Sequence, residues 1–280
     1  MPPWDESRKR NLALRAVSGV VLFPVAVWFT VLGGLPYAAL VGLTAALSAA
    51  ELVLMSGGMG LAGAYGAAVA GLFPLAALAG SEGSLFPTWG APALAAAAVL
   101  LLVLLLFRRG PPEAASRQVA VIAFSWLYCG LLLATAVGLR ERFGTGWVIL
   151  AFVVTWANDT FAYFAGHAFG RHRLYERISP KKTWEGFAGG VAGSVVGALV
   201  TRWLLLSSEL SPAGAVVIGL GGAVLGPLGD LAESMVKRAA GVKDSSRIIP
   251  GHGGLLDRID ALLFVAPWVY VCAAYLAHLL

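Results

Sequence analysis

Charged side chains are scarce in this sequence. Asp, Glu, Lys and Arg make up 12% of the 280 residues, and hydrophobic residues make up 59%. A soluble globular protein carries about 25% charged residues. The composition therefore excludes a chain whose whole surface faces water and predicts a protein that lies in a bilayer.

Cysteine is almost absent. The two that occur, Cys129 and Cys272, lie inside apolar segments and have no partner at a characteristic spacing. This excludes a disulfide framework and a cysteine-based zinc site. Both are expected to be packing residues.

Long apolar runs are abundant, and a membrane-spanning helix needs roughly 20 mostly apolar residues. Nine segments qualify: 12–33, 35–55, 58–80, 91–107, 118–139, 146–168, 184–206, 213–235 and 258–279. The first is too long for the apolar core of a signal peptide and is followed by no A-x-A site. The sequence predicts an all-α, polytopic integral membrane protein with about nine transmembrane helices.

The basic residues are distributed unevenly between the two sides of the predicted bundle. All Lys and Arg residues except Arg140, Arg142 and Arg202 lie at the N-terminus or near the loops that follow the fourth, sixth and eighth helices. The positive-inside rule then places the N-terminus in the cytoplasm and the C-terminus outside. We expect a multi-pass protein of the inner (plasma) membrane.

Polar residues divide the chain into two parts. Residues 1–117 are expected to be packing helices, in which Glu51 is the one acidic residue within a span. Residues 118–280 are expected to form the catalytic region, with cytoplasmic loops 169–183 and 236–257. Because ionisable groups at membrane depth are costly, those in the second part mark functional candidates. Glu51→Gln is accordingly expected to affect catalysis less than Asp257→Asn.

Asn158 and Asp159 form the first polar cluster. Asp159, Gly166 and Gly170 share one helical stripe, which could admit a ligand or a metal beside the carboxylate. Alternatively, the glycines allow close helix packing and Asp159 pairs with a neighbouring lysine.

A second cluster precedes the seventh predicted helix in the segment Ser179–Gly186. Lys181 and Lys182 lie beside a helix N-terminus that Thr183 could cap, and such a terminus favours phosphate. The alternative is ordinary cytoplasmic positive charge beside anionic lipid headgroups. Farther along, Gly189, Gly193 and Gly197 form a stripe typical of helix packing.

The third cluster lies at the end of the eighth predicted helix. Asp230, Glu233, Ser234 and Lys237 fall on one face of that helix. The following loop contains Gly251, Gly253 and Gly254, whose backbone could approach a ligand closely. Asp257 and Asp260 then occur three residues apart. Hard carboxylate oxygens suit Mg²⁺ better than zinc.

The segment from Ser234 to Asp260 resembles the signature of the phosphatidate cytidylyltransferase family, also called CDP-diacylglycerol synthase. The matching positions are Ser234, Lys237, Arg238, Lys243, Asp244, Ser246, Ile248 or Ile249, Pro250, His252, Gly253, Gly254, Asp257 and Arg258. The resemblance extends back to Asn158-Asp159 and the Ser179–Gly186 segment, and so covers roughly residues 155–260.

The resemblance implies a membrane enzyme, usually a homodimer, with a metal-dependent site that opens to the cytoplasm. Its partners would be CTP, phosphatidic acid and membrane lipids, with no nucleic acid. Asp230, Asp257 and Lys237 are the expected catalytic residues. Mg²⁺, as one or two cations, would be held by Asp230 and Asp257, with Asp159 and Asp260 as further candidates. The expected substrate-binding residues are Ser179, Lys181, Lys182, Ser234, Arg238, Lys243, Asp244, His252, Gly253, Gly254 and Arg258.

No residue pattern suggests a covalent nucleophile, so direct attack of the lipid phosphate on the α-phosphorus of CTP is expected. Two alternatives remain. A CTP-dependent kinase of a membrane lipid alcohol, such as dolichol or phytol kinase, would transfer the γ-phosphoryl group instead. A secondary transporter would also contain intramembrane carboxylates, although usually near the midplane between repeated halves.

Overall fold

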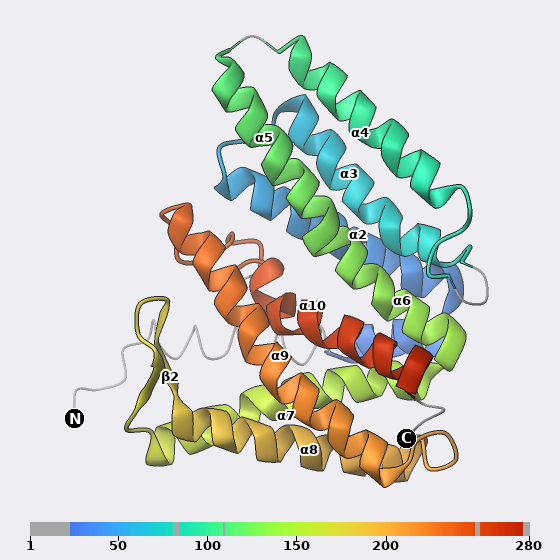
Figure 1. Cartoon of the computed structure of the whole chain (residues 1–280), viewed down its shortest axis with the longest axis vertical. Helices are drawn as coiled ribbons and strands as arrows, with labels where there is room; N and C mark the ends of the chain where they lie inside the picture. Colours follow the sequence, from blue (N-terminus) through green and yellow to red (C-terminus); the bar gives the residue numbers. More distant parts are fainter. Residues whose placement is uncertain (1–22, 81–83, 109, 250–252, 277–280) are drawn as a thin grey trace.

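The protein is an all-α polytopic structure, as the apolar runs predict. A computed structural model describes residues 23–80, 84–108, 110–249 and 253–276 (Figure 1). The helices are Phe23–Leu32, α2 (Gly34–Met55), α3 (Gly60–Ala77), α4 (Gly90–Leu106), α5 (Pro112–Ser125), α6 (Leu132–Phe143), α7 (Thr145–Phe169), α8 (Trp184–Leu205), α9 (Pro212–Ala239) and α10 (Leu256–Val271). Two π-helical turns, η1 (Trp126–Leu131) and η2 (Cys272–Leu276), continue α5 and α10.

All nine predicted segments are helical within the described residues, and seven helices are long and apolar enough to cross a bilayer. The two shorter apolar helices are Phe23–Leu32 and α4. One continuous helix, Pro112–Phe143, contains α5, η1 and α6, so the domain boundary predicted after residue 117 falls inside it. The number of crossings and their sidedness stay predictions.

A short β-hairpin occupies most of the predicted loop 169–183, which is a departure from the sequence expectation. Strand β1 (Arg173–Tyr175) pairs antiparallel with β2 (Ser179–Thr183). Glu185 in the first turn of α8 accepts hydrogen bonds from the backbone N–H groups of Arg171 and His172, at 3.1 and 3.2 Å. The hairpin is therefore tied to the start of α8. The hairpin was not predicted because its strands are short and polar and so lack the alternation of apolar residues that indicates a strand.

Close packing of α7 on α8 explains the glycine stripe. A Cβ at Gly189 would lie 2.3 Å from the Cβ of Ala165, and one at Gly193 would lie 2.6 Å from that of Phe161. Thr183 caps α8 as predicted, because its side chain accepts a hydrogen bond from the N–H of Gly186 at 3.1 Å. The sequence prediction of a packing stripe is confirmed.

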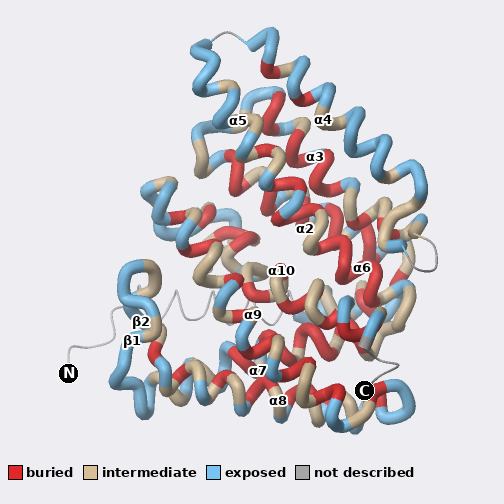
Figure 2. Tube along the Cα trace, viewed as in Figure 1, coloured by how far each residue is buried: buried red, intermediate tan, exposed pale blue. Residues whose placement is uncertain are grey.

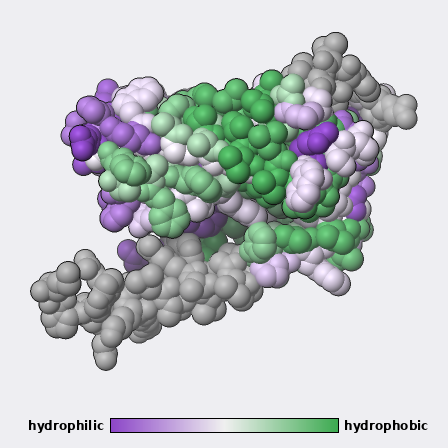
Figure 3. All heavy atoms as spheres, turned by 90° about the horizontal axis from the view of Figure 1, so that it is seen from below, coloured by the Kyte–Doolittle hydropathy of each residue, from purple (hydrophilic) through white to green (hydrophobic). Residues whose placement is uncertain are grey.

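Buried residues run through α2, α3 and α6, whereas α4 buries only Leu101 and Leu105 (Figure 2). Large apolar side chains of α7 and α8 are exposed, among them Phe164, Phe169 and Trp203. Hydrophobic residues cover the middle of the face seen in Figure 3, and hydrophilic residues gather at its left end, with a smaller group at the right. Such exposed apolar faces match the acyl chains of a bilayer.

Candidate active site

Helix α9 presents the four polar side chains of one face, as its sequence predicts. Glu233, Ser234 and Lys237 are buried, and Ser234 donates a hydrogen bond to Oδ1 of Asp230 at 3.2 Å. Lys237 makes ion pairs with both Glu233 and Asp257. A single buried ammonium group thus links α9 to the first turn of α10.

Asp257 receives hydrogen bonds on both carboxylate oxygens. Its Oδ1 accepts from Lys237. Its Oδ2 accepts from the N–H of Ser245 at 2.9 Å, the hydroxyl of Ser245 at 2.9 Å and the N–H of Gly254 at 2.8 Å. The carboxylate therefore links Ser245 to Gly254 within the loop between α9 and α10 (residues 240–255, the α9–α10 loop, of which 250–252 lie outside the described residues).

Gly253 and Gly254 shape this loop in two different ways. Gly253 has a φ of +82°, a left-handed conformation that a side chain would strain. A Cβ at Gly254 would lie 1.9 Å from Oγ of Ser245 and 2.6 Å from Oε2 of Glu51. At Gly254, the glycine is thus required by close packing, and its N–H is already bonded to Asp257.

The β-hairpin contributes Lys182 to the same region. Its Nζ lies 2.7 Å from Oδ2 of Asp230 and donates to the carbonyl oxygen of Pro227 at 3.2 Å. Pro227 has no N–H, which leaves the carbonyl oxygen of Ala223 without its helical donor. The side chain of Asn158 on α7 donates to that oxygen at 3.2 Å. Asn158 therefore ties α7 to the interrupted turn of α9.

Three carboxylates converge at the crossing of α9 and α10. One oxygen from each of Asp230, Glu233 and Asp260 lies within 4.8 Å of the others; we call these three residues the acidic cluster. Gly229 permits the approach, because a Cβ there would lie 2.5 Å from the carbonyl oxygen of Asp260. Glu233 is fully buried, and its Oε1 has no hydrogen-bond partner among the described residues.

The acidic cluster suits a hard divalent cation. Buried like charges repel, and a carboxylate oxygen with no donor is costly unless a cation satisfies it. Among the described residues, the ion pairs of Asp230, Glu233 and Asp257 use two ammonium groups, those of Lys182 and Lys237. With Asp260 included and every group ionised, two negative charges remain. The donor set therefore fits Mg²⁺.

The structure brings only some of the predicted site residues together. Asp159 is exposed on α7 and outside the acidic cluster, and it makes no ion pair among the described residues. The exposed predicted substrate-binding residues are Lys181, Arg238, Lys243, Asp244 and Arg258, and Ser179 is half-buried. His252 lies outside the described residues.

Sequence reasoning missed two residues. Glu233 was placed on the polar face of its helix but in no metal site, although it belongs to the acidic cluster. Glu51 was assigned to the packing half, yet it accepts hydrogen bonds from the α9–α10 loop and from the start of α10. Its signal was a lone carboxylate in an otherwise apolar span. Those contacts remove the basis for expecting Glu51→Gln to be mild.

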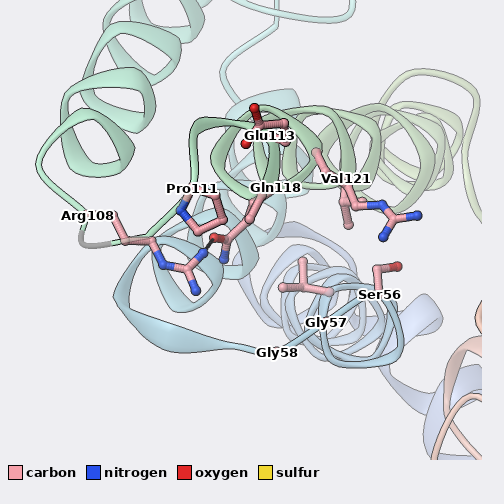
Figure 4. A pocket seen from close by; sticks show the side chains of 11 residues that line it. Ser56, Gly57, Gly58, Arg108, Pro111, Glu113, Gln118 and Val121 are labelled. Carbon is pink, nitrogen blue, oxygen red and sulfur yellow. Dashed lines mark hydrogen bonds between the residues drawn. The ribbon is translucent and has the colours of Figure 1, made fainter.

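A cavity of about 540 Å³ lies elsewhere, between the end of α2 and the start of α5 (Figure 4). Arg108, Glu113, Arg117 and Gln118 line it, and Arg108 donates a hydrogen bond to Gln118. None of the predicted catalytic, substrate-binding or metal-binding residues lines this cavity.

Comparisons with known proteins agree with the signature. The chain is 40% identical to a phosphatidate cytidylyltransferase of Bacillus subtilis (strain 168) over 159 residues, which are 56% of this chain and 59% of that protein. It is 44% identical over 140 residues to one of Brucella abortus biovar 1 (strain 9-941), covering 49% and 50% of the two chains. A phosphatidate cytidylyltransferase of Synechocystis sp. is 50% identical over 132 residues, covering 46% and 44%.

The matched stretches thus span about half the length of these curated relatives. A sequence model of the cytidylyltransferase family, in contrast, matches residues 13–276. That match takes in the acidic cluster, the α9–α10 loop and the helices that carry them. The chain therefore belongs to the cytidylyltransferase family.

Proposed function

We propose that this protein joins CTP to phosphatidic acid and forms CDP-diacylglycerol and pyrophosphate. The observation that carries the proposal is the convergence of two lysines with the acidic cluster, since Lys182 pairs with Asp230 and Lys237 pairs with Glu233 where α9 and α10 cross. The identity to phosphatidate cytidylyltransferases over part of the chain supports the same substrates.

In the proposed reaction, a phosphate oxygen of phosphatidic acid attacks the α-phosphorus of CTP. The bond from the α-phosphorus to the oxygen that bridges the α- and β-phosphates breaks, and pyrophosphate leaves with those electrons. A phosphate monoester is already anionic, so the nucleophile needs positioning more than deprotonation. Lys182 and Lys237 would offset the phosphate charge, together with the exposed Lys181 and Arg238.

Asp230, Glu233 and Asp260 are the residues proposed to hold Mg²⁺. When bound, the cation would screen the phosphates and polarise the reacting phosphoryl group. Asp257 remains a candidate metal ligand and catalytic residue, because its carboxylate could form one coordination bond to the cation in addition to its present hydrogen bonds. We propose that the site holds one or two cations.

We also propose the membrane location, the sidedness and the oligomeric state of the protein. The positive charge of the loops supports an inner-membrane protein whose site faces the cytoplasm. The exposed apolar faces of α7 and α8 support acyl-chain contact with membrane lipids. A homodimer is proposed on the family resemblance alone.

The test uses purified protein, Mg²⁺, phosphatidic acid and CTP labelled at either the α- or the γ-phosphate. Label at the α-phosphate should enter the lipid, and label at the γ-phosphate should appear in pyrophosphate. Diacylglycerol should not replace phosphatidic acid, because it lacks the attacking phosphate. Transfer of γ-label to a lipid alcohol would instead identify a kinase, and CTP-independent lipid or ion movement across vesicles would favour a transporter.

A further inference from the structure

Among the described residues, Glu51 is the residue of α2 whose side chain forms hydrogen bonds with the Ser234–Asp260 segment. Its Oε1 accepts from the hydroxyl of Ser246 at 2.6 Å and from the N–H of Leu255 at 2.9 Å. Its Oε2 accepts from the hydroxyl of Ser245 at 2.9 Å and from the N–H of Leu256 at 2.8 Å. Each carboxylate oxygen therefore receives one hydroxyl group and one backbone amide.

These contacts require a carboxylate. The amides of Leu255 and Leu256 stand at the start of α10, where backbone N–H groups have no partner within the helix and favour negative charge. Glu51 is only 1% exposed, so water cannot replace a lost acceptor there. Glutamine has nearly the same shape, but its amide nitrogen would bring a donor against an N–H or hydroxyl donor.

Ser245 connects Glu51 to the catalytic residues. Its hydroxyl oxygen lies 2.9 Å from Oε2 of Glu51 and 2.9 Å from Oδ2 of Asp257. Its single hydroxyl proton can be donated to only one carboxylate at a time, while its backbone N–H remains bonded to Asp257. Asp257 in turn pairs with Lys237. A continuous chain of contacts thus runs from α2 to the ammonium group on α9.

Close packing around Gly254 restricts the positions of the Glu51 carboxylate and of Ser245. A Cβ there would lie within 3 Å of both oxygens of Glu51 and even closer to Oγ of Ser245. A displacement of the Glu51 carboxylate would therefore disturb the loop at Gly254 and Ser245 together. Both residues donate hydrogen bonds to Asp257.

We infer that Glu51 is a positioning residue for catalysis, which fixes the α9–α10 loop and the first turn of α10 so that Asp257 and Lys237 face the acidic cluster. This inference rests on the proposed cytidylyl transfer. In this proposed role, Glu51 itself does not contact a substrate. The effect of changing it should appear in kcat, because a misplacement of about 1 Å can cost about 10²-fold in rate.

The principal test compares Glu51→Gln, Glu51→Asp and the control Leu52→Ala in purified protein. Leu52 is equally buried on the same helix, and its truncation leaves a cavity that destabilises the fold; its side chain has no polar group and so makes no hydrogen bond to the loop. We expect Glu51→Gln to lower kcat by about 10²-fold at temperatures where the variant is folded. Glu51→Asp keeps the charge and should recover at least about a tenth of the wild-type kcat, and Leu52→Ala should stay within about twofold.

A second measurement needs no activity. Hydrogen exchange of the Leu255 or the Leu256 amide, whichever faces the new amide nitrogen, should speed up by at least about tenfold in Glu51→Gln, because that amide loses its acceptor. Ser48→Ala should leave it unchanged, since Ser48 is buried one turn away and its hydroxyl has no partner among the described residues. If Glu51→Gln fails to fold, Ser246→Ala removes one donor from the same carboxylate and should lower kcat in the same direction.

The outcomes separate this inference from the proposed reaction. If the wild type transfers no cytidylyl group, the proposed function fails, while the exchange rates still test the tie between Glu51 and α10. In another outcome, the wild type is active while Glu51→Gln lowers kcat no more than Leu52→Ala does. Glu51 would then have a purely structural role, and the inference would be wrong. Unchanged exchange at Leu255 and Leu256 in Glu51→Gln would overturn the inference directly.

Discussion

Replacing Asp257 by asparagine tests how the α9–α10 loop is held. The sequence alone predicts loss of activity with unchanged stability, as for a metal ligand that makes no other contact. The structure predicts a loss of stability as well. An asparagine oxygen can keep the donors from Ser245 and Gly254, but the amide nitrogen must then face the ammonium group of Lys237.

The size of the effect follows from that one lost contact. The side chains of Lys237 and Asp257 are only 10% and 6% exposed, so solvent screens the pair little. A hydrogen bond to a charged group contributes about 1.5–3 kcal/mol. Lys237 keeps Glu233 as a partner, which limits the cost to about 2–4 kcal/mol rather than that of an isolated buried charge.

Thermal unfolding in detergent, with a chelator present, measures this prediction. For a chain of this size each 1 kcal/mol lowers Tm by about 2–4 °C, so Asp257→Asn should melt roughly 5–15 °C below the wild type. Asp244→Asn is the matched control. Its side chain is exposed and makes no hydrogen bond among the described residues, so the change should stay within about 0.5 kcal/mol. A Tm for Asp257→Asn within 2 °C of the wild type, roughly the scatter expected of the control, would refute the reasoning.

Three further predictions concern the metal, the hairpin and the topology. Asp260→Asn should abolish the rise in Tm on adding Mg²⁺ yet leave Tm in chelator unchanged or higher, because it removes repulsion within the acidic cluster. Lys182→Met should raise the KM for CTP, which enzyme kinetics would measure. It should lower the stability by about 1 kcal/mol or less, measured as Tm, because the ion pair between Lys182 and Asp230 is partly exposed. Reporter fusions after Leu280 and near Arg173 should lie on opposite sides of the membrane, and a shared side would mean that the predicted helix number is wrong by one.

Local patterns made much of the fold predictable. Apolar runs located each helix, because burial in lipid requires a continuous apolar segment whatever it packs against. Thr183 was predictable as a cap since its partner, Gly186, lies three residues away. The shared face of Ser234 and Lys237 followed from helical periodicity alone. Each of these inferences depends on residues that are close in sequence.

The contacts that define the site are of another kind. Glu51 and Leu255 are separated by 204 residues, and Lys237 and Asp257 by 20 residues across a loop. Neither spacing follows a period of helix or strand. A single sequence therefore shows that Glu51, Lys237 and Asp257 are ionisable and lie in or beside apolar segments, but not which groups pair.

The structure divides the five carboxylates of the site into two groups, one that accepts several hydrogen bonds and one whose members face like charges. Four donor groups surround Glu51 and three surround Asp257, with the hydroxyl of Ser245 shared between them, and Asp257 also pairs with Lys237. Such carboxylates are stabilised by the protein itself, and removing their charge should loosen the loop. The carboxylates of the acidic cluster face one another instead, and Glu233 has an oxygen without a donor. Lys182 and Lys237 offset only part of their mutual repulsion, and a bound metal ion would relieve the rest, so their charge should matter for metal binding more than for stability without metal. The backbone and hydroxyl donors of the loop thus distinguish Glu51 and Asp257, which hold the loop, from the acidic cluster, in which Oε1 of Glu233 has no donor among the described residues.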